Sequence, residues 1–153
     1  MFGVHEPPVD VHKIAEQLDF LVVPYDFPDE TSAVLYIHEG VKSIGVNQRH
    51  APVRQRFSIA HELGHYLSGH EDYTERGEGE KIQVDGRFDP SDPQQRLEQE
   101  ANDFAAELLM PEAMVKEEMA RMESFDATIL ARRFDVSEQA LWIRLVGLGL
   151  APE

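Results

Sequence analysis

The 153-residue chain contains no cysteine, which excludes disulfide bonds and metal sites built on thiolates. It also lacks any apolar run close to the about 18 residues that a membrane-spanning helix requires. Basic residues are scarce: 14 Lys and Arg stand against 29 Asp and Glu, and the net charge of −15 repels nucleic-acid phosphates. The first residues have neither the basic start nor the apolar stretch of a secretion signal. We therefore expect a cytoplasmic protein.

What the chain does contain is a five-residue pattern associated with metal binding. Residues 61–65 are His-Glu-Leu-Gly-His, an HExxH pattern in a segment with helical apolar spacing that follows Pro52. Because His61 and His65 lie one turn apart on the same helix face, both imidazoles can bind one ion. Catalytic zinc keeps one position open for water, and a carboxylate beside it, here Glu62, can serve as the base. Such a short pattern also arises by chance, so its context must decide.

Two histidines need a further ligand to make a stable catalytic site. The HExxHxxGxxH arrangement is excluded, because Ser68 and Glu71 stand where it requires glycine and histidine. The other source is a carboxylate on a later helix, predicted from the apolar residues at positions 97, 101, 104 and 108. Glu98 and Glu100 border this apolar stripe on opposite sides, and Glu107 lies two turns beyond Glu100 as a reserve candidate.

Two blocks of sequence carry a specific resemblance. Residues 56–65 are Arg-Phe-Ser-Ile-Ala-His-Glu-Leu-Gly-His, and residues 100–111 are Glu-Ala-Asn-Asp-Phe-Ala-Ala-Glu-Leu-Leu-Met-Pro. In these blocks the chain resembles the ImmA/IrrE family of zinc metallopeptidases. The likeness extends more weakly to the N-terminal strands and to residues 130–150, so it covers most of the chain.

The resemblance implies an assignment for each site residue. The glutamate directly before Ala-Asn corresponds to the family's third metal ligand, so the predicted metal ligands are His61, His65 and Glu100. Glu62 corresponds to the catalytic base. The predicted cofactor is Zn²⁺, with Mn²⁺ as the alternative ion.

We expect an α+β fold, in which a small antiparallel sheet packs on a zincin-like helical core. Alternating or continuous apolar residues predict strands at 20–24, 33–38 and 42–46. We expect two parts: a zincin-like metallopeptidase domain at 1–122, and a helical C-terminal appendage at 123–153 that packs on it.

The C-terminal appendage resembles a helix-turn-helix, with an N-cap at Ser137 before its second helix. A DNA-reading helix would expose cations and amides at its start, whereas this one begins with Glu138 and Gln139. Three arginines are also balanced by three acids over residues 124–150. We therefore expect packing or protein docking here, and no direct contact with nucleic acid.

Three functions are compatible with these features. The first is an intracellular zinc endopeptidase that, as the resemblance implies, cleaves a helix-turn-helix transcriptional repressor and so relieves repression. The second is a non-proteolytic anti-repressor or toxin–antitoxin component that acts by docking. The third is a DNA-binding protein. The intact HExxH pattern with Glu62 favours the first over the second, and the charge balance disfavours the third.

Overall fold

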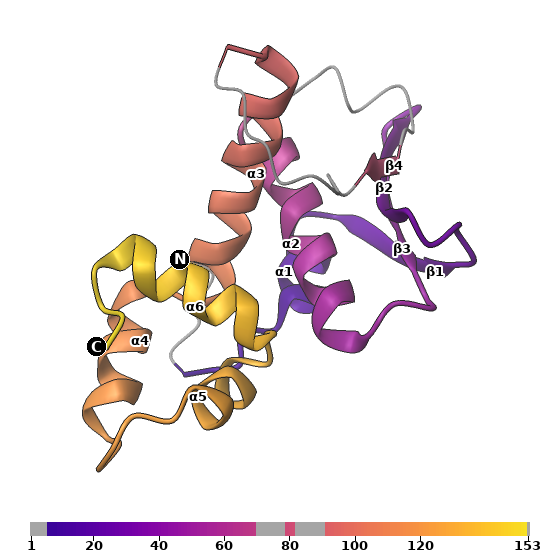
Figure 1. The fold of residues 1–153 in the computed structure, drawn as a ribbon. Helices are drawn as coiled ribbons and strands as arrows, with labels where there is room; N and C mark the ends of the chain where they lie inside the picture. The colour runs from indigo at the N-terminus through magenta and orange to yellow at the C-terminus, as the bar shows by residue number, and fades with distance from the viewer. Residues whose placement is uncertain (1–5, 70–78, 82–90, 153) are drawn as a thin grey trace.

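The computed structural model describes residues 6–69, 79–81 and 91–152 and has the expected α+β architecture (Figure 1). Among these residues the helices are α1 (Val11–Gln17), α2 (Pro52–Leu67), α3 (Pro93–Leu109), α4 (Glu112–Ala120), α5 (Ala127–Phe134) and α6 (Glu138–Leu148). The strands are β1 (Phe20–Tyr25), β2 (Thr31–His38), β3 (Val41–Asn47) and β4 (Gly79–Lys81).

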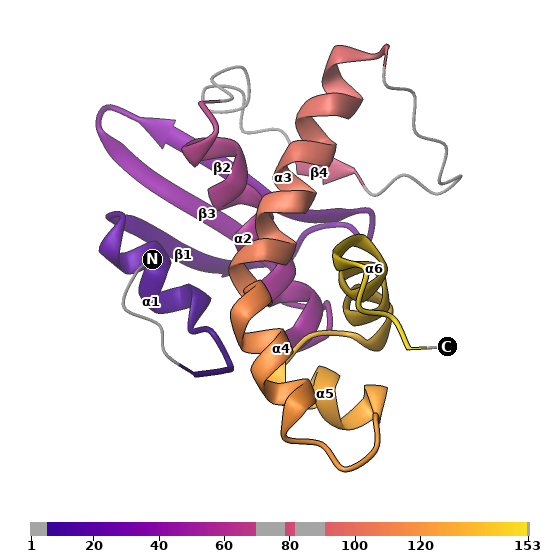
Figure 2. The same ribbon diagram turned by 90° about the vertical axis from the view of Figure 1, so that its left-hand side faces the viewer.

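Helix α2 is the central element of the fold. It lies between the sheet on one side and α3 on the other, while α4, α5 and α6 gather near one end of α3 (Figures 1 and 2). Apolar side chains from α1, the sheet and all of the helices from α2 to α6 meet in one core cluster. Within the described parts of the chain, no helix is both long and apolar enough to cross a membrane.

The four strands form one sheet in the order β1-β3-β2-β4. Strands β2 and β3 make an antiparallel hairpin whose turn residues Glu39 and Gly40 both have positive φ, 50° and 81°. Strand β1, however, pairs with β3 in parallel. The expectation of a purely antiparallel sheet is therefore wrong for this pair, and the sheet is mixed.

The buried side chain of Asn47 stabilises the connection that passes from β1 to β2 across the end of β3. Its Nδ2 lies 3.3, 3.1 and 2.9 Å from the carbonyl oxygens of Phe27, Pro28 and Thr31, which lie in or next to the β1–β2 connection. Because Asn47 is the last residue of β3, it holds this connection against the end of that strand. The connection therefore links β1 and β2 on opposite sides of β3.

Helices α5 and α6 form the expected helix-turn-helix-like pair. Asp135 ends α5 in the left-handed conformation with φ 56°, and the Ser137 side chain accepts a hydrogen bond from Ala140 N at 3.0 Å to cap α6. The pair buries Leu130, Phe134, Leu141 and Leu145 in the same core as the rest of the chain. The boundary between residues 122 and 123 stays a prediction.

Arg56 on α2 joins three parts of the chain. Its guanidinium donates hydrogen bonds to the carbonyl oxygens of Val9 at 2.8 Å, Asp135 at 3.1 Å and Phe134 at 3.3 Å. Its side chain is only 11% exposed and also pairs with the Asp135 carboxylate at 3.3 Å. Burial lowers the pKa of Arg56, although Asp135 and Asp10 oppose that shift. The contacts fix the α5–α6 turn and the N-terminal segment to α2.

Replacing Arg56 should therefore destabilise the fold. Arg56→Leu leaves the half-exposed Asp135 carboxylate and three carbonyl groups without their donor, so we expect the free energy of unfolding to fall by about 2–4 kcal/mol in urea titrations. Arg56→Lys should recover only part of this, because an ammonium lacks the planar fork of donors. The control is Arg132→Leu on the exposed surface of α5, which should change stability by less than about 0.5 kcal/mol. Equal effects at Arg56 and Arg132 would contradict the assignment.

Candidate metal centre

Helix α2 carries the HExxH residues through the middle of the protein. Pro52 occupies its first turn, where a missing N–H costs no hydrogen bond. Every residue from Ser58 to His65 is buried, because the sheet and α1 cover one side of the helix and α3 covers the other. His61, Glu62 and His65 are only 0%, 3% and 1% exposed. Polar side chains buried to this degree need hydrogen-bond partners. The two histidines find theirs on α3, in Glu98 and Asn102.

Gly64, the fourth residue of the pattern, sets how closely the two helices approach. A Cβ atom at this position would lie 3.1 Å from the carbonyl oxygen of Ala101 and 3.1 Å from the Phe104 Cβ. The backbone of α3 therefore packs directly on the glycine of α2. This approach brings the side chains of α3 that precede and follow Ala101 within reach of the two histidines.

Three side chains with metal-ligand atoms converge between α2 and α3. His61 Nε2 lies 3.0 Å from His65 Nε2 and 2.8 Å from Glu98 Oε2, and His65 Nε2 lies 3.2 Å from Glu98 Oε1. Among the described residues, His61, His65 and Glu98 form the one group of three side chains with metal-ligand spacing. The predicted pair of histidines is thus brought together, and a carboxylate completes the triangle.

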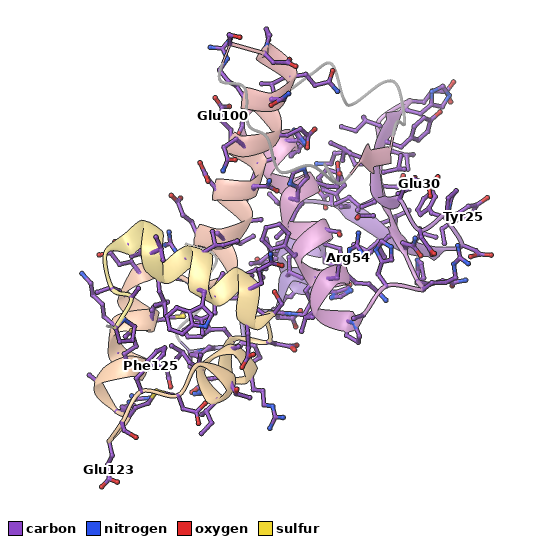
Figure 3. All side chains as sticks on the ribbon, viewed as in Figure 1. Tyr25, Glu30, Arg54, Glu100, Glu123 and Phe125 are labelled. Atoms are coloured by element: carbon purple, nitrogen blue, oxygen red, sulfur yellow. The ribbon has the colours of Figure 1, made fainter. Side chains whose placement is uncertain are left out.

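The carboxylate that meets the histidines is Glu98, two residues before the predicted Glu100. Glu98 precedes the buried Ala101 by three residues and Ala105 by seven, so all three lie on the face of α3 that packs on α2. Glu100 is exposed, and Figure 3 shows it on the side of α3 away from α2. Glu107, the reserve candidate, is also exposed and outside the group. The structure thus brings Glu98, and not the predicted Glu100, next to the two histidines, while the metal-ligand role of either glutamate stays a prediction.

Asn102 orients one of the histidines. It lies one turn after Glu98 on α3, and its Oδ1 is 2.7 Å from His61 Nδ1. With an oxygen facing it, Nδ1 carries the ring proton, which leaves Nε2 directed at the Glu98 carboxylate. Nε2 of the same ring lies 2.8 Å from Glu98 Oε2, a contact that either a proton or a metal ion can bridge.

The ionisation of Glu98 follows from the same contacts. Burial alone would raise the pKa of its carboxyl group, but hydrogen bonds from His61 and His65, and the charge of these rings when protonated, hold that pKa below its ordinary value. Glu98 is therefore an anion at neutral pH, the form in which a carboxylate binds metal.

The donor set suits zinc in chemistry and size. Two imidazole nitrogens and one carboxylate oxygen are a common ligand set of catalytic zinc, which leaves the fourth position open. Ligands about 2.0–2.1 Å from a tetrahedral ion lie about 3.3 Å from one another. The observed separations of 2.8, 3.0 and 3.2 Å need only a slight expansion. An HExxH helix facing a carboxylate on a second helix is typical of the zinc metallopeptidase class.

Comparison with known proteins identifies the family. The sequence model of the IrrE N-terminal-like domain, peptidase family M78, matches residues 15–146, so the chain belongs to this family. No curated protein matches the sequence. A transcriptional regulator of Mycobacterium tuberculosis has a similar fold, with a TM-score of 0.64 and 22% sequence identity. The alignment covers 94% of this chain and 42% of that chain.

Adding one methyl group at Gly64 should separate α2 from α3. Overpacking costs about 1–3 kcal/mol, and the better helix propensity of alanine returns about 1 kcal/mol, so Gly64→Ala should lower the free energy of unfolding by about 1 kcal/mol. Gly147 in α6 is the matched control, since a Cβ there meets nothing within 4 Å. Gly147→Ala should stabilise the protein by about 0.5–1 kcal/mol in the same urea titrations. Stabilisation by both substitutions would contradict the tight helix contact.

Proposed function

We propose that this chain is a metal-dependent endopeptidase whose ion is held by His61, His65 and Glu98. The observation that carries the proposal is the convergence of these three ligand atoms beside the buried Glu62, in a chain of a peptidase family. We propose Zn²⁺ as the ion, with Mn²⁺ as the alternative, because the two nitrogen donors and one oxygen donor suit zinc. In this site a zinc ion supplies Lewis acidity, which lowers the pKa of water and polarises a substrate carbonyl group.

In this proposal Glu62 performs the proton transfers. It follows His61 directly on α2, so its side chain leaves the helix about 100° from that of the first histidine and need not occupy the ligand position. As a carboxylate it would accept a proton from the attacking water and return it to the amine that leaves. Its burial would limit competition from bulk water for that proton.

We further propose a helix-turn-helix transcriptional repressor as the substrate, so that cleavage relieves repression in the cytoplasm. Support comes from the resemblance of the sequence to the ImmA/IrrE family and, at the level of fold, from the regulator of M. tuberculosis. We expect the α5–α6 pair to serve packing or docking to protein, since Leu130, Phe134, Leu141 and Leu145 lie in the core, Ile143 and Val146 are exposed, and its charges balance. Direct binding of this chain to nucleic acid is not part of the proposal.

The ligand set can be tested by metal analysis of two glutamate variants. Glu98→Ala should lose bound zinc, because only two protein ligands remain, whereas Glu100→Ala should keep about one ion per chain. The two residues are on the same helix, so the second variant controls for changes in α3 itself. Inductively coupled plasma mass spectrometry after dialysis gives the stoichiometry. Loss of zinc in Glu100→Ala with retention in Glu98→Ala would restore the prediction made from the sequence.

The role of Glu62 can be tested with Glu62→Gln. This variant should keep its fold and its zinc, and should cleave the cognate helix-turn-helix repressor about 10²–10⁴-fold more slowly. Intact-mass spectrometry of the repressor over time measures the cleavage. Wild-type protein stripped of zinc by a chelator should be equally inactive and should recover on addition of zinc.

The same variant separates cleavage from docking. If Glu62→Gln still relieves repression fully in cells, the chain acts as a non-proteolytic anti-repressor or a toxin–antitoxin component, and the peptidase proposal is wrong.

A further inference from the structure

Asn102 is the polar side chain of α3 that contacts His61 from the side opposite the converging ligand atoms. Its Oδ1 accepts from Nδ1 of His61 at 2.7 Å, while Nε2 of the same ring faces Glu98 at 2.8 Å. Asn102 is half-buried and lies one turn from Glu98, so one face of α3 provides both contacts. The imidazole is thereby held at both of its nitrogens by a single helix.

The contact with Asn102 determines what the other nitrogen can do. A neutral imidazole has one protonated nitrogen and one lone pair, and the hydrogen bond to one nitrogen decides which is which. Because Nδ1–H donates to Asn102, the lone pair of the neutral ring is on Nε2, which lies 3.0 Å from Nε2 of His65. Without that acceptor, the ring could place its proton on Nε2 and rotate, and both changes oppose metal binding.

The amide of Asn102 supplies an acceptor oxygen to His61 without adding a charge to the site. Glu98 already brings a negative charge to the site, because its pKa is held below the ordinary value. A carboxylate at position 102 would add a further negative charge to a chain that already carries −15. The neighbouring acid, Asp103, is exposed and accepts a hydrogen bond from Gln99 at 2.8 Å on the outer surface of α3.

We infer that Asn102 is a positioning residue that holds His61 in its Nδ1–H form and thereby sets the affinity of the site for its ion. The inference rests on the proposed ligand set, and it concerns ion binding rather than cleavage. Asn102 would touch neither the ion nor the substrate.

The test compares zinc affinity and the His61 ring proton in a series of variants of the full chain. Asn102→Leu has a similar size but no acceptor, and should bind zinc about 10–100-fold more weakly in competition with a fluorescent chelator. Asn102→Asp keeps an acceptor oxygen and should bind zinc at least as tightly as the wild type. In ¹⁵N NMR of the zinc-loaded proteins, the His61 Nδ1–H should exchange slowly in the wild type and Asn102→Asp, and rapidly in Asn102→Leu.

Control variants separate this role from general packing. Gln99→Leu removes an exposed hydrogen bond from the same helix and should leave zinc affinity within about twofold of wild type. Asn102→Ala serves if the leucine variant does not fold. Wild-type zinc affinity in whichever of Asn102→Leu and Asn102→Ala folds would overturn the inference. Rapid exchange of the His61 Nδ1–H in Asn102→Asp would also overturn it. Loss of zinc in Glu100→Ala instead of Glu98→Ala would overturn the ligand set, and the ring-proton result would still report on Asn102.

Discussion

The close contact between α2 and α3 at Gly64 is the constraint on which the site depends. Side chains on two helices can share an ion only when the helix backbones are near, and a hydrogen atom at position 64 allows the Ala101 carbonyl to approach within 3.1 Å of where a Cβ would stand. The turn of α3 at that contact bears Glu98, three residues before Ala101, and Asn102, directly after it. Both side chains contact the imidazole ring of His61. The glycine of the HExxH pattern is therefore part of the site's geometry, although it binds nothing.

Much of the fold follows from local patterns, and the exception shows where local reasoning stops. The hairpin of β2 and β3 could be predicted because Glu39-Gly40 supplies a turn between two apolar strands. The parallel pairing of β1 with β3 could not, because short connections favour antiparallel neighbours. The connection that permits it is held by contacts distant in sequence, between the Asn47 amide and the carbonyl groups of the β1–β2 connection. A single asparagine near the end of an apolar strand carries little signal for such a contact.

Part of the site could likewise be predicted from neighbouring residues, and part depends on contacts distant in sequence. His61, Glu62 and His65 are spaced by the helix itself, so their common location could be predicted from five residues. Which glutamate meets the two histidines depends on the rotation of α3 about its own axis. The side chains of Glu98 and Glu100 differ by about 200° in direction around this axis. Apolar residues at 97, 101, 104 and 108 leave both glutamates at a border, whereas the residues buried in the structure centre the face on Ala101 and Ala105. Asn102, four residues after Glu98, was the available clue, because two polar residues one turn apart can contact the same group.

These relationships also bear on how an ion would enter the protein. In small zinc domains the ligands come together only when the metal binds, so that metal and fold are inseparable. Here the two histidines lie on a helix buried on both sides by an extensive apolar core, and the contacts of Gly64 and Asn102 are made within the protein itself. The ligand atoms lie 2.8–3.2 Å apart in this arrangement. Because packing in the core already orders these side chains, the affinity of such a site would reflect mainly the small expansion needed to admit the ion.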